Sequence, residues 1–564
     1  MTRNFLPFLI LIVTLLLSTC SIPEAADTVI YGGTIYTMDE NFPVVEAIAV
    51  KNGRILMRGK KVDVMRRMDD DTKMLDLKGQ TLIPGFIEGH GHLLDVGYQE
   101  MNLDLSNVSS YEEMILLVKA AVEAAEPGAW IVGKGWHQDK WSIKPPSMVE
   151  GFPVHHPLSA VSPLNPVFLE HASGHAALVN ARAMQEASIV GNETKAITTV
   201  EGGTIIRDGN GNPTGLLNEN ALELVGKLVP RNDSLALSMA LKACLRNGIT
   251  SFHDAGVRLE TIELYKRFRD RGKLVPSVYV MITGFDRNLV YEYFDKGPEI
   301  DPTGTLTVRS VKLNCDGALG SRGAWLLEEY ADAPGNYGMP TLPMDTVLKT
   351  SRLALRAGFQ VCSHAIGDRA NREILDRYET AFKEKPDLAT DHRFRIEHAQ
   401  HIDPADLRRF SALAVLPAMQ AIHMSSDRPW AIDRLGEKRI VEGAYMWQSL
   451  LKSGAKIING TDAPVEPLNP IASFYASVSR KTLKKEPPDG YEPAERMTRE
   501  QALRSYTIDA AFGAFEEKLK GSIEDGKLAN FTVLTKDIMA IPEDEILEAR
   551  IAMTIVNGEV VYIK

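Results

Sequence analysis

Short apolar runs alternate with helical stretches through most of the chain, and this alternation constrains the fold more than any other feature. Eight of these runs have the length and composition of buried strands. They are residues 82–87, 248–252, 275–282, 306–313, 359–363, 394–396, 412–416 and 456–459. Strands that alternate with helices form parallel sheets, and eight such units close into a barrel. We therefore expect an α/β fold built on a (β/α)8 TIM barrel.

The two ends of the chain have a different texture. Residues 28–60 and 531–562 consist of short alternating runs with turn pairs such as Asn52-Gly53 and Asn557-Gly558. Neither segment is long enough to bury a core alone, so we expect both to form one composite β-sandwich domain. The predicted boundaries are 27–82 for its first half, 83–515 for the barrel and 516–564 for its second half.

Residues from about 130 to 230 interrupt the strand–helix rhythm. They contain Trp136 and Trp141, a proline-rich stretch from Pro145 to Pro166, and a turn at 208–213 between two β-like runs. Long loops that leave the carboxyl ends of barrel strands commonly carry function. We therefore expect an insertion after the first barrel strand, and we expect it to roof the barrel mouth.

The N-terminal segment is predicted to be a targeting signal rather than part of the fold. Arg3 precedes a mostly apolar stretch over residues 5–17, which is too short to span a bilayer and suits a secretory signal peptide over residues 1–26. Residues 17–21 resemble a bacterial lipobox, which implies a lipoprotein signal over 1–19 with Cys20 lipidated. Thr19 departs from that pattern, and cleavage near Ala26 is the alternative. We expect an exported protein, either periplasmic or lipid-anchored to the membrane through Cys20.

Charge and cysteine content bear on two further functions, nucleic-acid binding and metal binding by cysteines. The net charge is -11 and the chain has no basic stripe, so we expect no nucleic-acid partner. Cys244, Cys315 and Cys362 each lie inside an apolar segment without the spacing of a metal motif. We interpret them as buried free thiols.

Polar side chains follow several of the apolar runs at the point where each run ends. His90 and His92 are two residues apart, so in an extended chain both imidazoles point to the same side. Two neutral imidazoles suit a borderline metal such as zinc, although an isolated His-x-His pair is more often unrelated to metal binding. The polar residues at the ends of other runs are Lys312, His364, His398 and Asp462. Since the carboxyl ends of barrel strands meet at one face, the sequence predicts a shared metal site there.

Several segments also match a known family in their order along the chain. They are residues 84–92, 135–136, 173–180, 213–215, 311–322, 364–368, 395–400 and 460–465. Together they resemble the metal-dependent amidohydrolase superfamily, and most closely its YtcJ-like, N-substituted formamide deformylase-like branch (amidohydrolase family 3). The resemblance extends over roughly residues 28–564. One departure is Glu88, which stands where many relatives carry aspartate.

The resemblance implies a ligand set for one or two divalent metal ions, with zinc expected. His90 and His92 would bind one metal together with Asp462. His364 and His398 would bind a second, and Lys312 would bridge the two as a carboxylated lysine. An unmodified lysine is a cation that repels a metal, so Lys312 would have to be a carbamate or neutral. An ion pair between Lys312 and Asp316 is the alternative.

The resemblance further implies an amidohydrolase, which hydrolyses C–N bonds other than peptide bonds. A metal-activated hydroxide would attack the carbonyl, and Asp462 would shuttle the proton to the leaving amine. Trp136, His175 and Arg322 would lie near substrate, with a structural role as the alternative for each.

The sequence leaves other functions open. The expected substrate is a small amide, N-formyl or N-acyl compounds included, but a cyclic amidase, a deaminase or a lactonase would use the same site. A different class is a non-catalytic exported protein that binds metal or ligand. The oligomeric state also stays open, a homodimer included.

Overall fold

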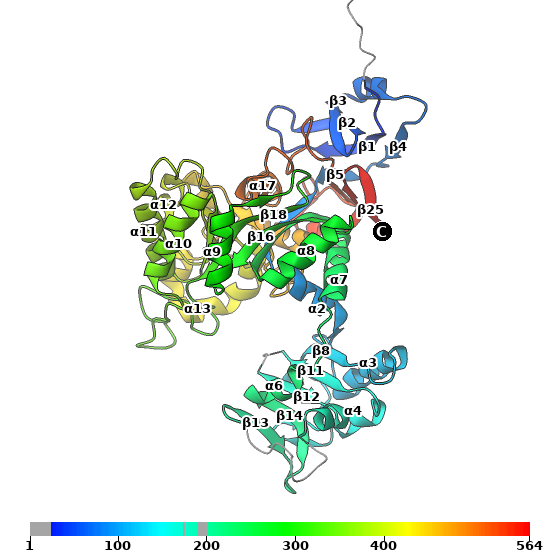
Figure 1. The fold of residues 1–564 in the computed structure, drawn as a ribbon, viewed down its shortest axis with the longest axis vertical. Coiled ribbons are helices and arrows are strands. Elements are labelled where there is room, and N and C mark those ends of the chain that lie inside the picture. Colours follow the sequence, from blue (N-terminus) through cyan, green and yellow to red (C-terminus); the bar gives the residue numbers. More distant parts are fainter. Residues whose placement is uncertain (1–23, 173–174, 190–199) are drawn as a thin grey trace, which may run out of the picture.

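The computed structural model describes residues 24–172, 175–189 and 200–564 (Figure 1). The predicted signal peptide, apart from residues 24–26, and the candidate lipidation site Cys20 lie outside the described residues. Within the described part of the chain, every helix is too short or too polar to cross a membrane.

A parallel barrel forms the centre of the molecule, as predicted. Its strands follow the order β22-β21-β20-β19-β18-β16-β15-β6, and all neighbours in this path are parallel. The strands are β6 (Phe86–Gly91), β15 (Ile249–Val257), β16 (Ser277–Thr283), β18 (Leu306–Asn314), β19 (Gln360–Ala365), β20 (Arg395–His398), β21 (Leu416–Met419) and β22 (Ile458–Asn459). The Asp462 backbone N–H, just after β22, donates to His90 O at 2.8 Å, which brings the first and last strands together and nearly closes the barrel.

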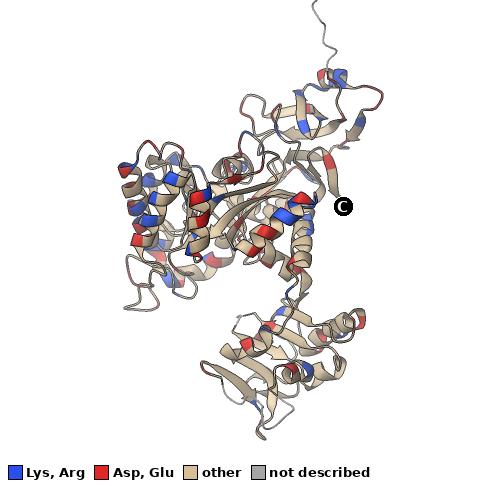
Figure 2. Ribbon diagram, in the orientation of Figure 1, with Lys and Arg blue, Asp and Glu red and all other residues tan. Residues whose placement is uncertain are grey.

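Helices cover the outside of the barrel (Figure 1). They are α2 (Leu93–Met101), α7 (Asp233–Arg246), α8 (Leu259–Asp270), α9 (Arg287–Lys296), α10 (Met344–Ala357), α11 (Asp368–Glu384), α12 (Leu407–Ala412), α13 (Ala421–Gly443), α14 (Trp447–Lys452), α15 (Pro470–Ser479), α16 (Arg499–Ser505) and α17 (Ile508–Gly513). The main hydrophobic core lies between these helices and the strands and includes Phe252, Ile282 and Phe394. Acidic and basic side chains are interspersed on the outer helices (Figure 2), as expected for faces turned to solvent.

One predicted strand is displaced. The sequence predicts a strand at 412–416, but Ala412 ends helix α12 and β21 begins only at Leu416. The chain turns between them at Ala414, whose φ is 51°. An apolar run this short does not distinguish a helix end from a strand.

Strands from both ends of the chain share one mixed sheet. Its order is β25-β24-β23-β5-β1-β2-β3, with β4 beside β1, and the C-terminal β23 pairs antiparallel with the N-terminal β5. The strands are β1 (Thr28–Tyr36), β2 (Val44–Lys51), β3 (Arg54–Gly59), β4 (Lys73–Asp76), β5 (Thr81–Pro84), β23 (Phe531–Leu534), β24 (Ile551–Val556) and β25 (Glu559–Ile563). The expected partnership of the two termini is therefore confirmed.

The chain passes from this sheet to the barrel at Pro84-Gly85. The apolar run at 82–87 is divided there between β5 of the mixed sheet and β6 of the barrel. A Cβ on Gly85 would lie 2.2 Å from Thr250 Oγ1, so only glycine allows β15 to approach this closely. The same short segment therefore provides the central strand β5 of the mixed sheet and the first strand β6 of the barrel.

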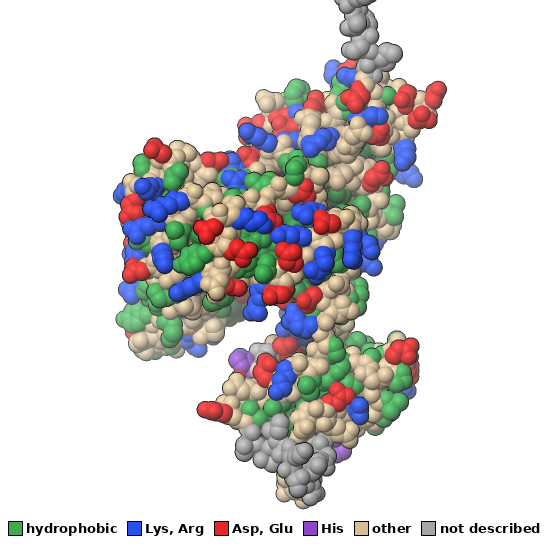
Figure 3. Space-filling view, viewed as in Figure 1, with side chains coloured by type: hydrophobic (Ala, Val, Ile, Leu, Met, Phe, Trp, Pro, Cys, Tyr) green, Lys and Arg blue, Asp and Glu red, His purple; other side chains and the backbone are tan. Residues whose placement is uncertain are grey.

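A separate six-stranded sheet follows the first barrel strand, in the order β13-β14-β12-β11-β8-β7. Its strands are β7 (Leu103–Asp104), β8 (Ile131–Trp136), β11 (Val167–His171), β12 (Ala176–Val179), β13 (Gly203–Arg207) and β14 (Pro213–Glu219), with helices α3 (Tyr111–Ala124), α4 (His156–Val161), α5 (Ala181–Glu186) and α6 (Glu223–Gly226). We call residues 103–226 the inserted unit. It starts earlier than the expected residue 130, because α3 packs into its core. Figures 1 and 3 show it at one end of the molecule, joined to the rest through a narrow neck.

Candidate active site

A cavity of about 620 Å³ opens at the carboxyl ends of the barrel strands. All six predicted metal ligands line it: His90, His92, Lys312, His364, His398 and Asp462. They come from β6, β18, β19, β20 and the turn after β22, and so from strands far apart in the sequence. The structure therefore brings together every residue of the predicted metal site, at the face where barrel enzymes carry their chemistry.

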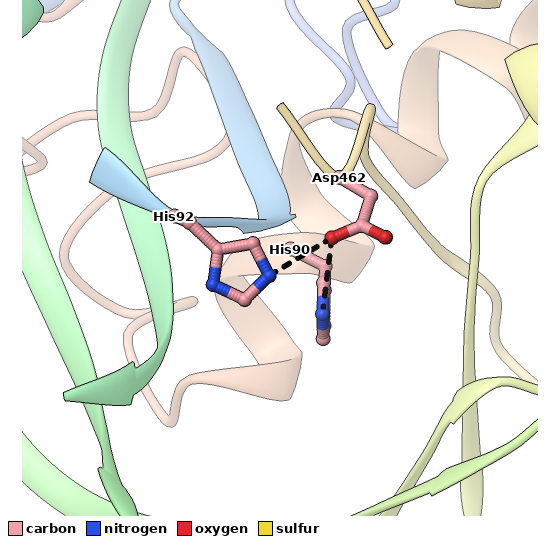
Figure 4. Close-up of side chains that lie close together, drawn as sticks. All are labelled: His90, His92 and Asp462. Carbon is pink, nitrogen blue, oxygen red and sulfur yellow. Dashed lines mark ion pairs between the residues drawn. The ribbon is translucent and has the colours of Figure 1, made fainter. Parts of the chain in front are cut away.

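Three of these side chains converge most closely. One ligand atom from each of His90, His92 and Asp462 lies within 4.8 Å of the others (Figure 4). Asp462 Oδ1 is 3.2 Å from His92 Nε2 and 3.6 Å from His90 Nε2. Two nitrogens and one carboxylate oxygen form a donor set that suits zinc and related divalent metals.

The backbone fixes this group of three. His92 N–H donates to Ala463 O at 2.8 Å, and Asp462 N–H donates to His90 O at 2.8 Å. These two hydrogen bonds hold the turn that carries Asp462 against the end of β6. Gly89 permits the close contact, because a Cβ there would lie 2.3 Å from Asn459 O. Glu88 holds the following turn, since its Oε1 accepts from Thr461 N–H at 2.5 Å. The longer side chain of glutamate at position 88, where many relatives carry aspartate, thus contacts the turn that carries Asp462.

Hydrogen bonds on the far side of three imidazole rings set their orientation. His90 Nδ1 lies 2.5 Å from Glu397 Oε2, and His92 Nδ1 lies 3.0 Å from Ala255 O. His398 Nδ1 lies 2.8 Å from Gln420 Oε1. An acceptor at Nδ1 places the ring proton there and leaves Nε2 unprotonated.

Burial keeps most of these imidazoles neutral, as metal binding requires. It lowers the pKa of His90 to about 4 and that of His364 to about 3. It also lowers the pKa of His398 well below its usual range. For His92, burial alone would lower the pKa, but the Asp462 carboxylate raises it overall.

Asp462 Oδ1 and His364 Nε2 are buried polar atoms of the site without a hydrogen-bond partner among the described residues. Burial alone would raise the pKa of Asp462, but His92 and the other imidazoles hold it well below the usual range, so the carboxylate is ionised. A buried acceptor without a partner is costly, and a divalent cation would satisfy both atoms. The residues present therefore fit a metal.

Lys312 does not form the alternative ion pair with Asp316. Its Nζ lies 3.0 Å from His90 Nε2, and burial lowers the pKa of the amine. The Asp316 carboxylate instead accepts hydrogen bonds from three backbone N–H groups and lies 3.4 Å from His364 Nε2. The alternative pairing is therefore wrong, and Lys312 is among the metal-site imidazoles.

Glu397 and Arg395 belong to the site but were not singled out from the sequence. Arg395 is fully buried and donates to Glu397 through Nε (2.7 Å) and Nη2 (2.8 Å). It also donates to Gly89 O at 2.7 Å. The available signal was the spacing of Arg395 and Glu397, which at i and i+2 share one face of β20. Two charged residues inside an apolar strand require each other or a nearby site.

The three predicted substrate-binding residues lie elsewhere. Trp136 is buried in the core of the inserted unit, where its Nε1 donates to Leu169 O at 2.9 Å. His175 is exposed and lies 3.0 Å from Glu219 Oε2. Arg322 pairs with Asp332 at 2.8 Å. None of them lines the cavity, and none of the described residues of the inserted unit does so. The predicted roof over the barrel mouth is therefore wrong for the part of that unit the structure describes.

Comparison with known proteins identifies the family. The model of the amidohydrolase family matches residues 73–562. Fold, site and this match together define the class: the chain belongs to the amidohydrolase family, in the branch that the sequence motifs indicated. It is a hydrolase of the metal-dependent amidohydrolase superfamily, with His90, His92 and Asp462 as its candidate metal site.

Relatives match over nearly the whole chain. The chain is 34% identical to the protein LONG AFTER FAR-RED 3 of Arabidopsis thaliana, covering 95% of this chain and 92% of the relative. It is 30% identical to a protein named as the amidohydrolase YtcJ of Bacillus subtilis, covering 95% and 99%. It is 26% identical to the N-substituted formamide deformylase of Arthrobacter pascens, covering 96% and 99%.

A solved structure supports the same class. The chain is similar to an uncharacterized metal-dependent hydrolase from Pyrococcus furiosus, with a TM-score of 0.72 and 27% identity. The likeness covers 91% of this chain and 100% of that one.

Proposed function

We propose that the protein hydrolyses the C–N bond of a small N-formyl or N-acyl amide. The observation that carries the proposal is the cluster of His90, His92 and Asp462 at the base of an open cavity. Similarity to an N-substituted formamide deformylase supports the choice of an amide as substrate. The products would be a carboxylate, formate for a formamide, and a free amine.

The residues of the candidate metal site form two groups, one for each metal ion. His90, His92 and Asp462 would hold one ion, and His364 and His398 would hold a second. Lys312 would join both as a carbamate, because its lowered pKa favours the uncharged amine that reacts with carbon dioxide. When bound, a divalent metal such as zinc lowers the pKa of water to about 7 and so supplies hydroxide at neutral pH.

The chain's own groups would orient the imidazole rings and transfer the proton. Glu397, Ala255 O and Gln420 keep three imidazole rings aimed into the cavity. Asp462 would accept the proton of the attacking water and return it to the nitrogen as the C–N bond breaks. Its ionised state suits it to accept a proton, and the hydrogen bond from its backbone N–H to His90 O holds it next to the imidazoles.

A direct test combines turnover with metal analysis. Zinc-loaded protein should hydrolyse N-formylbenzylamine, and a chelator should abolish that activity. Asp462→Asn should lower kcat by about a hundredfold or more while reducing metal content less, because the amide oxygen can still ligate but cannot take the proton. Asp433→Asn, an exposed position on α13, serves as the control. A near-wild-type rate in Asp462→Asn would refute the assigned role.

Export remains a separate proposal that rests on the sequence of residues 1–26. The mature protein would begin near Ala26 or at a lipidated Cys20. Intact mass spectrometry of protein from the native host, before and after lipase treatment, distinguishes the two. A chain that retains Met1 and residues 2–26 would overturn both.

A further inference from the structure

Two carboxylates line the outer part of the active-site cavity without an ionic partner. Asp427 lies on α13 and Glu466 lies shortly after Asp462. Gln400 Nε2 donates to Asp427 Oδ2 at 3.3 Å, and Ser426 Oγ donates to Glu466 Oε1 at 2.5 Å. Neither carboxylate forms an ion pair with any residue in the described ranges. Two negative charges therefore share one wall of the cavity.

The nearby basic residues do not neutralise this wall. Arg428 follows Asp427 in sequence, but it is buried and pairs with Glu492 at 2.7 Å. Arg258 also lines the cavity, yet it comes from the β15 side. There it shares an adjoining cavity of about 500 Å³ with acidic residues, namely Asp95, Asp233, Asp254 and Glu260. Arg258 follows β15, whereas Asp427 lies on α13 together with His423, whose imidazole lowers the pKa of Asp427.

A buried polar atom on the same helix independently points to a ligand. His423 is only 8% exposed and lines the cavity, and its Nε2 has no hydrogen-bond partner among the described residues. Positions 423 and 427 are one helical turn apart and so share a face of α13. The His423 ring stacks at 6.1 Å from that of His398. His423 therefore connects the metal site to the two carboxylates.

Apolar groups line another part of the cavity. Phe285 is 77% exposed and Val465 is 67% exposed, although both are large apolar side chains at the mouth. Leu319 and Trp430 line the same space. Exposed apolar surface next to a polar site commonly marks where the body of a ligand binds. The complementary ligand has an apolar stem with a positive charge at its end.

We propose that the wall formed by Asp427 and Glu466 selects amides that carry a second, cationic amino group, such as N-formyl or N-acyl derivatives of diamines. The amide would lie at His90, His92 and Asp462, with its apolar stem along Trp430 and Phe285. The ammonium group would donate to the two carboxylates, and such charge-assisted hydrogen bonds are among the stronger ones in proteins. The reaction in this inference rests on the proposed function, whereas the recognition of a cation does not.

Burial raises the pKa of Asp427 to about 6, with His423 lowering it and the neighbouring Glu466 raising it further. A carboxylate held in this way gains more from an added cation than one that is already paired.

Three matched substrates test the proposal on zinc-loaded full-length protein. They are N-formylbenzylamines with a para aminomethyl, methyl or carboxylate group, which differ mainly in charge. We expect kcat/KM for the cationic compound to exceed that for the neutral one by about ten- to a hundredfold, with the anionic compound slowest. In Asp427→Asn and in Glu466→Gln the ratio of cationic to neutral substrate should fall several-fold. Asp433→Asn, an exposed carboxylate on the same helix, should keep the wild-type ratio.

A binding measurement separates this inference from the proposed reaction. Calorimetric titration compares 4-methylbenzylamine with 4-methylbenzyl alcohol on the wild type and the same variants. The amine should bind more tightly than the alcohol, and the gap should shrink in Asp427→Asn and Glu466→Gln but not in Asp433→Asn. If no formamide is hydrolysed, the proposed function fails while this titration still decides the inference. An unchanged gap in both variants, or equal turnover of all three substrates, would overturn it.

Discussion

Glu397→Gln tests whether the hydrogen bond between Glu397 and His90 supports metal binding. Glu397 is fully buried and accepts from His90 Nδ1 at 2.5 Å and from Arg395 at 2.7 and 2.8 Å. Burial alone would raise its pKa, but Arg395 and His90 hold the pKa well below the usual range, so Glu397 is charged. Glutamine keeps the shape and one acceptor oxygen but removes the charge.

Two effects of different size follow from that contact pattern. Loss of an outer partner of a metal-binding histidine typically weakens metal affinity by about 10- to 100-fold, or about 1.4 to 2.7 kcal/mol. The variant also leaves Arg395 as a buried cation without its partner, which costs about 3–5 kcal/mol of stability. We therefore expect weaker zinc binding together with a lower free energy of unfolding.

Competition with a chromogenic chelator measures the zinc affinity, and urea unfolding of metal-free protein measures the stability. The double variant Arg395→Met/Glu397→Gln removes the unpaired cation and should recover much of the stability, but not the affinity. Glu495→Gln provides the matched control, because Glu495 is buried and accepts from Ser449 N–H at 2.9 Å outside the cavity. Wild-type zinc affinity in Glu397→Gln would refute the positioning role.

Two further predictions concern stability. Gly89→Ala should cost about 1–3 kcal/mol in urea unfolding, because its Cβ would lie 2.3 Å from Asn459 O, whereas Gly209→Ala meets nothing within 4 Å and should cost little. A result in which both substitutions cost the same would contradict the close-contact argument. Burial lowers the pKa of His392 from 6.5 to about 4, so the folded state binds fewer protons than the unfolded state between these values. The contribution of His392 to the free energy of unfolding is therefore fully present above about pH 6.5. It is lost as the pH falls toward 4, by at most about 1.4 kcal/mol per pH unit. The variant His392→Gln should flatten the measured slope of stability against pH. An unchanged slope in that variant would show that His392 does not titrate as described.

The barrel and its metal ligands could be predicted because they follow from local patterns. Each ligand stands at the end of an apolar run, and parallel strands place such ends together regardless of their separation in sequence. His90 and His92 show this most clearly, since strand geometry alone puts both on one side. The shared sheet of the two termini could likewise be predicted, because neither segment buries a core by itself.

Other features depend on tertiary contacts that no local pattern encodes. Trp136 matches a family motif, but its burial in the inserted unit is decided by packing against residues such as Trp141 and Leu169. Glu397 next to His398 gives no sign of which ring it holds, since its partner His90 lies 307 positions away. The place of the inserted unit at one end of the molecule, next to α2 and α7 (Figure 1), is likewise not encoded in a local pattern.

Metal content is the most direct test of the metal site. Wild-type protein incubated with zinc and desalted should hold one to two equivalents by elemental mass spectrometry. His90→Asn/His92→Asn should lose at least one equivalent and all amide hydrolysis, with its circular dichroism spectrum unchanged. A double variant that retains the full metal content, or a wild type that binds no divalent metal, would contradict the assignment of His90, His92 and Asp462 as a metal site.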